Sequence, residues 1–135
     1  MPALTISQTI VAACLFLVAC IAILGGSLQF YLGQPDTQPR LDNVHRFMAG
    51  VYLGSGLIAL WAGVTIRRQG TLIYLIAFSV LLAGTGRLIS MGVVGVPEPV
   101  TLWLGYLVPE LLVPFVMSTA HVASKEGSPS VQLRQ

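Results

Sequence analysis

Four long runs of apolar residues limit what this chain can fold into. They extend over about residues 6–31, 47–66, 71–90 and 100–122. Each is long enough to cross the hydrocarbon core of a bilayer as a helix, which takes about 20 residues. Only 9% of the residues are charged, whereas a soluble domain usually carries about a quarter. The sequence therefore predicts an all-α integral membrane protein with four transmembrane helices in one bundle.

The segments between these runs are polar or rich in helix-breaking residues, namely "LGQPDTQPRLDN", "RRQG" and "MGVVGVPEP". We expect one transmembrane domain over residues 1–123 and a polar C-terminal tail over residues 124–135. The first run is expected to be a retained span rather than a signal peptide. Met1–Thr9 carries no Lys or Arg, and the apolar run continues beyond Cys20.

Positive charges predict an orientation. One side of the membrane would hold Arg67, Arg68, Lys125 and Arg134, and the other would hold Arg40 and Arg46. The excess favours both termini on the cytoplasmic side. A net charge of +2, dispersed along the chain, argues against a nucleic-acid partner. The two cysteines, Cys14 and Cys20, lie roughly 9 Å apart along one helix and cannot form a disulfide with each other.

Glu110 lies in the middle of the last apolar run, beside Pro109. If that helix enters the membrane near Val100, Glu110 lies about 15 Å deep, close to the midplane. A lone carboxylate there costs at least about 2.5–3.5 kcal/mol, so it must be protonated, paired or beside water. Arg87, in "GTGRLIS", is expected at a compatible depth on an antiparallel helix. Side chains lean toward the helix N-terminus, so the two lean toward each other. We predict that Arg87 and Glu110 make contact, directly or through one water.

Two prolines in the last run indicate a polar pocket around this pair. Pro109 and Pro114 leave the carbonyls of Gly105 and Glu110 without helical donors, and such groups need other partners at membrane depth. The candidate ligand-binding residues are Asn43, Arg46, Tyr52, Arg87, Tyr106 and Glu110, with His45 and Thr85 as further wall residues. Arg46 is expected to extend outward to the lipid headgroups and could form the roof of the pocket. The alternative is that the Arg87–Glu110 pair only fixes helix order and register.

Small residues predict how the helices pack within the bundle. The expected stripes are Ala12, Ala19, Ala22, Gly26 and Gly33 in the first run; Gly50, Gly54 and Gly63 in the second; and Ser79, Ala83, Gly86 and Ser90 in the third. Tyr31, Trp61, Trp103 and Tyr106 are interpreted as anchors at the membrane surfaces. His121, near the end of the last run, is interpreted as a cation favoured by the helix dipole.

Three segments, "DNVHRFMAGVYLGSGLIALW", "GTGRLISMGVVGVPEP" and "LGYLVPELLVP", together resemble the bacterial membrane family catalogued as domain of unknown function 4345. The shared positions are Asn43 with His45, Arg46 and Phe47; Gly86, Arg87 and Leu88 with Ser90; Gly95 with Pro97; and Glu110. The resemblance implies a short four-helix protein, and we expect it in the bacterial inner membrane. It implies no established activity.

Four functions remain open. The first is a membrane module that binds a lipid, quinone or other amphipathic molecule, with its polar head against Arg46, Arg87 and Glu110. The second is an accessory or scaffold subunit of a larger membrane complex, or a homo-oligomer. A lipid isomerase and a proton-coupled exporter, each using Glu110, rank below these. The chain has no phosphate loop, no catalytic Ser or Cys motif, no haem-attachment motif and no metal-ligand spacing. We therefore expect no cofactor and no metal, and the balance is against an enzyme.

Overall fold

The computed structural model describes residues 3–34 and 36–126. Its elements are α1 (Ile6–Leu32), α2 (Pro39–Val64), the short 3-10 helix η1 (Ile66–Arg68), α3 (Thr71–Val94) and α4 (Val100–Glu126). Within these residues there is no β-strand. Each of the four α-helices is long and apolar enough to cross a membrane. The all-α fold class with four candidate spans is therefore confirmed, and the chain is a multi-pass membrane protein by this criterion.

All four helices extend beyond the predicted spans, α1 by a single residue. The largest difference is in α2, which begins at Pro39 rather than at residue 47. Proline suits the first turn of a helix because its missing N–H would have no partner there, and Asp42 in the same turn complements the helix dipole. At the other end of the chain, α4 continues to Glu126. The remainder of the expected tail, residues 127–135, lies outside the described residues.

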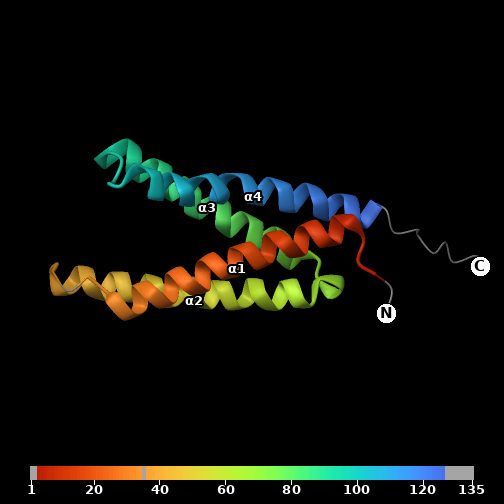
Figure 1. Cartoon of the computed structure of the whole chain (residues 1–135), viewed down its shortest axis with the longest axis horizontal. Coiled ribbons are helices and arrows are strands. Elements are labelled where there is room, and N and C mark those ends of the chain that lie inside the picture. The colour runs from red at the N-terminus through yellow and green to blue at the C-terminus, as the bar shows by residue number, and fades with distance from the viewer. Residues whose placement is uncertain (1–2, 35, 127–135) are drawn as a thin grey trace, which may run out of the picture. The chain divides into compact units, whose positions relative to one another are not determined.

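The chain divides into two compact units. One unit, Ala12–Ile66, holds most of α1 and all of α2. The other holds α3 and α4 together with the start of the chain up to Val11. Within each unit the two long helices lie side by side and run in opposite directions (Figure 1). We call them the α1–α2 hairpin and the α3–α4 hairpin.

The α1–α2 hairpin packs through residues with little or no side chain. A Cβ atom on Gly26 would lie 2.9 Å from the backbone nitrogen of Leu53, and one on Gly56 would lie 2.8 Å from Cγ1 of Ile23. The buried positions of α1 are Val11, Ala12, Leu15, Ala19, Ala22 and Gly26, and from Ala12 onward they repeat about every 3.5 residues, as in left-handed helix pairs. The stripe predicted for α1 is thus confirmed from Ala12 to Gly26. On α2 the predicted Gly63 is buried, and a Cβ atom there would lie 3.1 Å from Cε1 of Phe16. A Cβ atom on Gly54 would meet nothing within 4 Å, and the closest contact falls on Gly56, which was not predicted.

The small-residue stripe predicted for α3 is wrong. Ser79, Ala83, Gly86 and Ser90 are all exposed, and a Cβ atom on Gly86 would meet nothing within 4 Å. The buried positions of α3 are instead Ile73, Ile76, Ala77 and Gly84. Gly84 contacts α4, because a Cβ atom there would lie 3.1 Å from Cβ of Glu110.

Candidate functional site

Arg87 on α3 and Glu110 on α4 form a direct ion pair. The Arg87 Nε donates to the Glu110 Oε2 over 2.7 Å. Only 10% of the Glu110 side chain is exposed, against 30% of the Arg87 side chain. The contact predicted from the sequence is therefore confirmed, and the deeply placed carboxylate has a charge-assisted partner.

Glycine brings the two helices close enough for this contact. Gly84 lies three residues before Arg87, so both residues are on the same face of α3. Because Gly84 has no side chain, α4 can pass with Glu110 and Leu111 against the α3 backbone. Pro114, buried one turn after Glu110, cannot donate to the Glu110 carbonyl. The Glu110 carbonyl, which lacks its helical donor, therefore lies close to the Gly84 backbone where the two helices meet.

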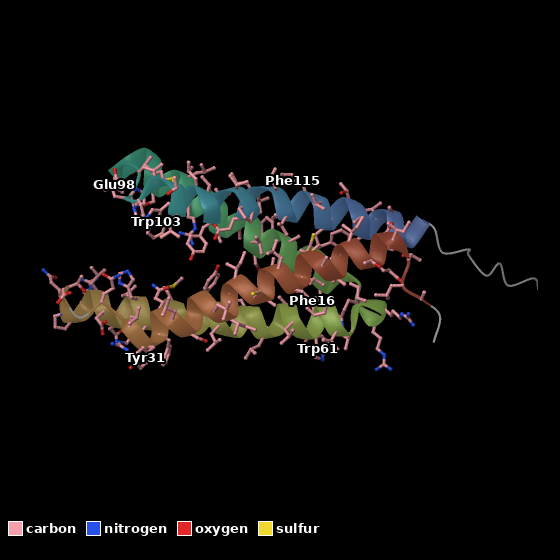
Figure 2. All side chains as sticks on the ribbon, viewed as in Figure 1. Phe16, Tyr31, Trp61, Glu98, Trp103 and Phe115 are labelled. Atoms are coloured by element: carbon pink, nitrogen blue, oxygen red, sulfur yellow. The ribbon has the colours of Figure 1, made fainter. Side chains whose placement is uncertain are left out.

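Two aromatic side chains of α4 cover the guanidinium of Arg87. Its central carbon lies 5.6 Å from the ring centroid of Trp103 and 5.5 Å from that of Tyr106. The Trp103 Nε1 in turn donates to the Glu98 carbonyl over 3.3 Å, and Figure 2 places Glu98 and Trp103 at the same end of the α3–α4 hairpin. Cation–π contacts of this kind stabilise the charge without using its N–H groups.

The ion pair uses only part of the hydrogen-bonding capacity of its two members. Among the described residues, this contact is the one hydrogen bond that the Arg87 side chain makes, and the Glu110 side chain makes no other. A guanidinium has five N–H donors, and a carboxylate has two acceptor oxygens. The terminal nitrogens Nη1 and Nη2 of Arg87 and the Oε1 of Glu110 therefore remain available to a further polar group.

Trp103 and Gly84 are the two residues of this site that sequence reasoning missed. Trp103 was interpreted only as a surface anchor, although its spacing of three and seven residues from Tyr106 and Glu110 places all three on one face of α4. Gly84 was passed over in favour of Gly86, its neighbour in "GTGR". Its separation of three residues from Arg87 is the signal that could have identified it.

Arg46, Asn43 and Tyr52 lie on α2, in the α1–α2 hairpin. Instead of extending freely outward, Arg46 donates from Nε to the Asp42 Oδ2 over 2.9 Å and from Nη1 to the Phe30 carbonyl over 2.8 Å. The Phe30 carbonyl belongs to the last turn of α1, where helical donors are lacking. Asn43 is exposed and Tyr52 half-buried. That these three residues contribute to ligand binding stays a prediction.

The turn after α1 depends on the same contacts. Gly33 follows the helix with a φ of +61°, and its N–H donates to the Gln29 carbonyl over 2.8 Å, which is a common way to end a helix. The Asp42 Oδ1 accepts from the Gln34 N–H over 2.6 Å. A Cβ atom on Gly33 would collide with the Arg46 guanidinium and with the Asp42 Oδ1.

Gly33→Ala is therefore expected to destabilise the protein by about 1–2 kcal/mol, the usual cost of a left-handed backbone with a side chain, and to displace Arg46 as well. Unfolding in mixed detergent and denaturant measures the change. Gly54→Ala is the matched control, since a Cβ atom there meets nothing within 4 Å. Equal stability of the two variants would contradict this description of the turn.

The two further wall candidates make local contacts within their own helices. The His45 Nδ1 lies 2.9 Å from the Leu41 carbonyl. The Thr85 hydroxyl donates to the Leu81 carbonyl over 2.8 Å, and Thr85 is exposed. Neither contact joins these residues to the Arg87–Glu110 pair.

The sequence suggested that His121 lies near a helix end, but the structure does not place it there. The helix continues to Glu126, and His121 is 4% exposed. Its ring meets the Tyr74 ring edge-on at 5.0 Å, and the Lys125 ammonium lies over the same Tyr74 ring at 5.3 Å. The His121 Nε2 has no hydrogen-bond partner among the described residues.

A shallow hollow of about 290 Å³ lies elsewhere between α3 and α4, lined by Tyr74, Ala77, Phe78, Leu81, Pro114, Phe115 and Ser118. It is not part of the Arg87 site. Pro114, one turn after Glu110, lines the hollow together with Phe115 and Ser118, whereas Trp103, Tyr106 and Glu110 precede these residues on α4. The apolar hollow therefore lies next to the polar pair along the α3–α4 hairpin.

Over residues 3–121 the chain matches the protein family described as domain of unknown function (DUF4345). It belongs to this family. The match spans α1 to α3 and most of α4, with Arg87 and Glu110 inside it. No curated protein and no solved structure matches the chain significantly. The resemblance noted in the sequence is thus confirmed for the family.

Proposed function

We propose that this DUF4345 protein binds a lipid, quinone or other amphipathic small molecule, with the polar head of the ligand at Arg87 and Glu110. The observation that carries the proposal is the partly used ion pair. Its terminal nitrogens and its second carboxylate oxygen have no protein partner among the described residues. These atoms are not enclosed by the protein, so a ligand can reach them, and a polar group that faces hydrocarbon without a partner costs several kcal/mol. A ligand head that supplies the missing partners recovers this free energy.

The surroundings of the pair suit an amphipathic molecule better than a water-soluble one. Both charged side chains lie within helices long and apolar enough to span a membrane. Ionisable residues at such depth commonly mark functional sites. Trp103 and Tyr106 add aromatic surface at the pair. A molecule with a small polar head and an apolar body can reach this position from the bilayer.

Glu110→Gln tests the proposal. We expect the fold to persist, because glutamine keeps the shape and an acceptor oxygen, and ligand affinity to fall about 5- to 150-fold. Native mass spectrometry of the protein, taken from its own membranes, measures the bound fraction. Glu98→Gln is the matched control, because Glu98 is exposed in the loop before α4. A bound molecule retained at full occupancy in a double variant with leucine at positions 87 and 110 would refute the proposal.

A role as an accessory subunit is the second candidate, favoured by one observation. Ser79, Ala83, Gly86 and Ser90 form an exposed small-residue stripe on α3, and such stripes let another helix approach closely in lipid. The same mass spectra test this role. A partner chain that is lost in Gly86→Leu would support it, and a spectrum of the monomer with ligand alone would exclude it.

We further propose that the protein lies in a bacterial inner membrane with both termini in the cytoplasm, as its positive charges favour. With an impermeant thiol reagent applied to intact cells, Asp36→Cys in the α1–α2 loop is expected to react and Ser128→Cys is not. Ser128 lies outside the described residues. Cys14 and Cys20 lie inside α1 and should give no background. Labelling at position 128 and not at position 36 would show the opposite orientation.

A further inference from the structure

We infer that the head of this ligand is uncharged and carries an oxygen acceptor beside a hydroxyl donor. The inference rests on the proposed binding at Arg87 and Glu110 and specifies the chemistry of the molecule. Three properties of the α3–α4 hairpin lead to it, namely its local charge, the position of its aromatic rings and the atoms left free in the ion pair.

The local charge disfavours an anionic head. From Gly84 to Leu111 the charged residues are Arg87, Glu98 and Glu110, so this end of the hairpin carries a formal charge of −1. The single cation is already paired with a carboxylate at 2.7 Å. A phosphate or carboxylate that approached the Arg87 terminal nitrogens would lie beside the Glu110 Oε1 and be repelled by it. At low dielectric such repulsion is stronger than in water.

The position of the aromatic rings disfavours a cationic head. Quaternary and primary ammonium groups bind in proteins against aromatic faces. Here the guanidinium of Arg87 lies over the rings of both Trp103 and Tyr106, at 5.6 and 5.5 Å. A second cation that reached the Glu110 carboxylate would stand next to this guanidinium. The positive charge that the rings accommodate is therefore already supplied by the protein.

The free atoms specify a neutral head. The Arg87 Nη1 and Nη2 can only donate, and the Glu110 Oε1 can only accept. The head must then present an acceptor oxygen to Arg87 and an O–H group to Glu110. Two kinds of membrane molecule share this chemistry: an acylglycerol with an ester carbonyl next to a free hydroxyl, and a reduced quinone with its ring oxygens and O–H groups.

Binding of defined probes to the purified full chain in detergent tests the inference. Dioleoylglycerol has both the carbonyl and the hydroxyl, trioleoylglycerol lacks the hydroxyl, dioleoyl phosphatidic acid is an anion and oleylamine is a cation. We expect dioleoylglycerol, or a short-chain quinol, to bind at least about tenfold more tightly than trioleoylglycerol, phosphatidic acid or oleylamine. A tenfold difference in affinity corresponds to about one hydrogen bond. A quinol that outcompetes dioleoylglycerol identifies the quinone class as the source of the ligand, and the reverse order identifies an acylglycerol.

Glu110→Gln provides the internal check, because it removes the negative charge and keeps an acceptor oxygen. The variant is expected to bind phosphatidic acid more tightly than the unmodified protein does. Its affinity for phosphatidic acid should therefore lie closer to its affinity for dioleoylglycerol. Phosphatidic acid or oleylamine bound by the unmodified protein as tightly as dioleoylglycerol would overturn this inference and leave the proposed function standing. If none of the probes binds and native mass spectra show no ligand, the proposed function fails with it.

Discussion

Arg87→Leu is expected to lower the free energy of unfolding by about 3 kcal/mol. Removing one partner of a buried ion pair typically costs about 3–5 kcal/mol, because the other charge is left uncompensated. The lower end of this range applies because 30% of the Arg87 side chain is exposed. Glu110, with 10% of its side chain exposed, is the charge left behind. Unfolding monitored by helical circular dichroism in mixed detergent and denaturant measures the difference.

A double variant distinguishes the contribution of the ion pair from the cost of leaving one of its charges unpaired. Replacing both Arg87 and Glu110 by leucine removes both charges, and its stability is expected to return to within about 1 kcal/mol of the unmodified protein, since apolar replacements of buried pairs are often neutral. Arg68→Leu is the matched control, because this exposed cation of η1 should contribute less than about 0.5 kcal/mol. If Arg87→Leu proved as stable as Arg68→Leu, the pair would contribute nothing to the fold.

The Arg87–Glu110 contact could be predicted from the sequence for a physical reason. A charge in an apolar run has few ways to exist at membrane depth, and the run lengths fixed the depth of both residues to within about a helical turn. The same reasoning placed Arg46 at the headgroups but did not predict its hydrogen bonds to Asp42 and to the Phe30 carbonyl. Its contacts depend on the positive φ of Gly33 and on the exact end of α1, which composition does not specify.

The face that each helix presents to its neighbour was harder to predict. In a soluble protein, polar residues mark the outer face of a helix. In lipid the outer face is as apolar as the inner one, so the sequence of α3 shows little contrast around its axis. Leu82 and Ile89 are exposed there, while Ile73 is fully buried. The choice of Gly86 over Gly84 failed for this reason, and Arg87 itself was the better guide to the buried face.

Gly26→Val is expected to have the second large effect, a loss of about 2–3 kcal/mol, at the upper end of the usual cost of overpacking. A Cβ atom at this position would lie 2.9 Å from the backbone nitrogen and 3.1 Å from the Cα of Leu53, and 3.1 Å from the carbonyl oxygen of Ala49. These are backbone atoms, so no rotation of a side chain can make room. The two helices must move apart, and the contacts along their buried stripes are lost with them.

Gly54→Val controls for the lower helix propensity of valine, because a Cβ atom at position 54 meets nothing within 4 Å. Gly56→Val gives an intermediate test. The closest atom there is Cγ1 of Ile23, at 2.8 Å, which can yield, whereas Cβ of Ala22 and the backbone nitrogen of Ile23, each at 3.0 Å, cannot. Truncating Ile23 to alanine should therefore recover part of the stability lost in Gly56→Val. No comparable truncation should rescue Gly26→Val. If Gly26→Val and Gly54→Val unfold at the same denaturant concentration, α1 and α2 do not pack backbone to backbone at this position.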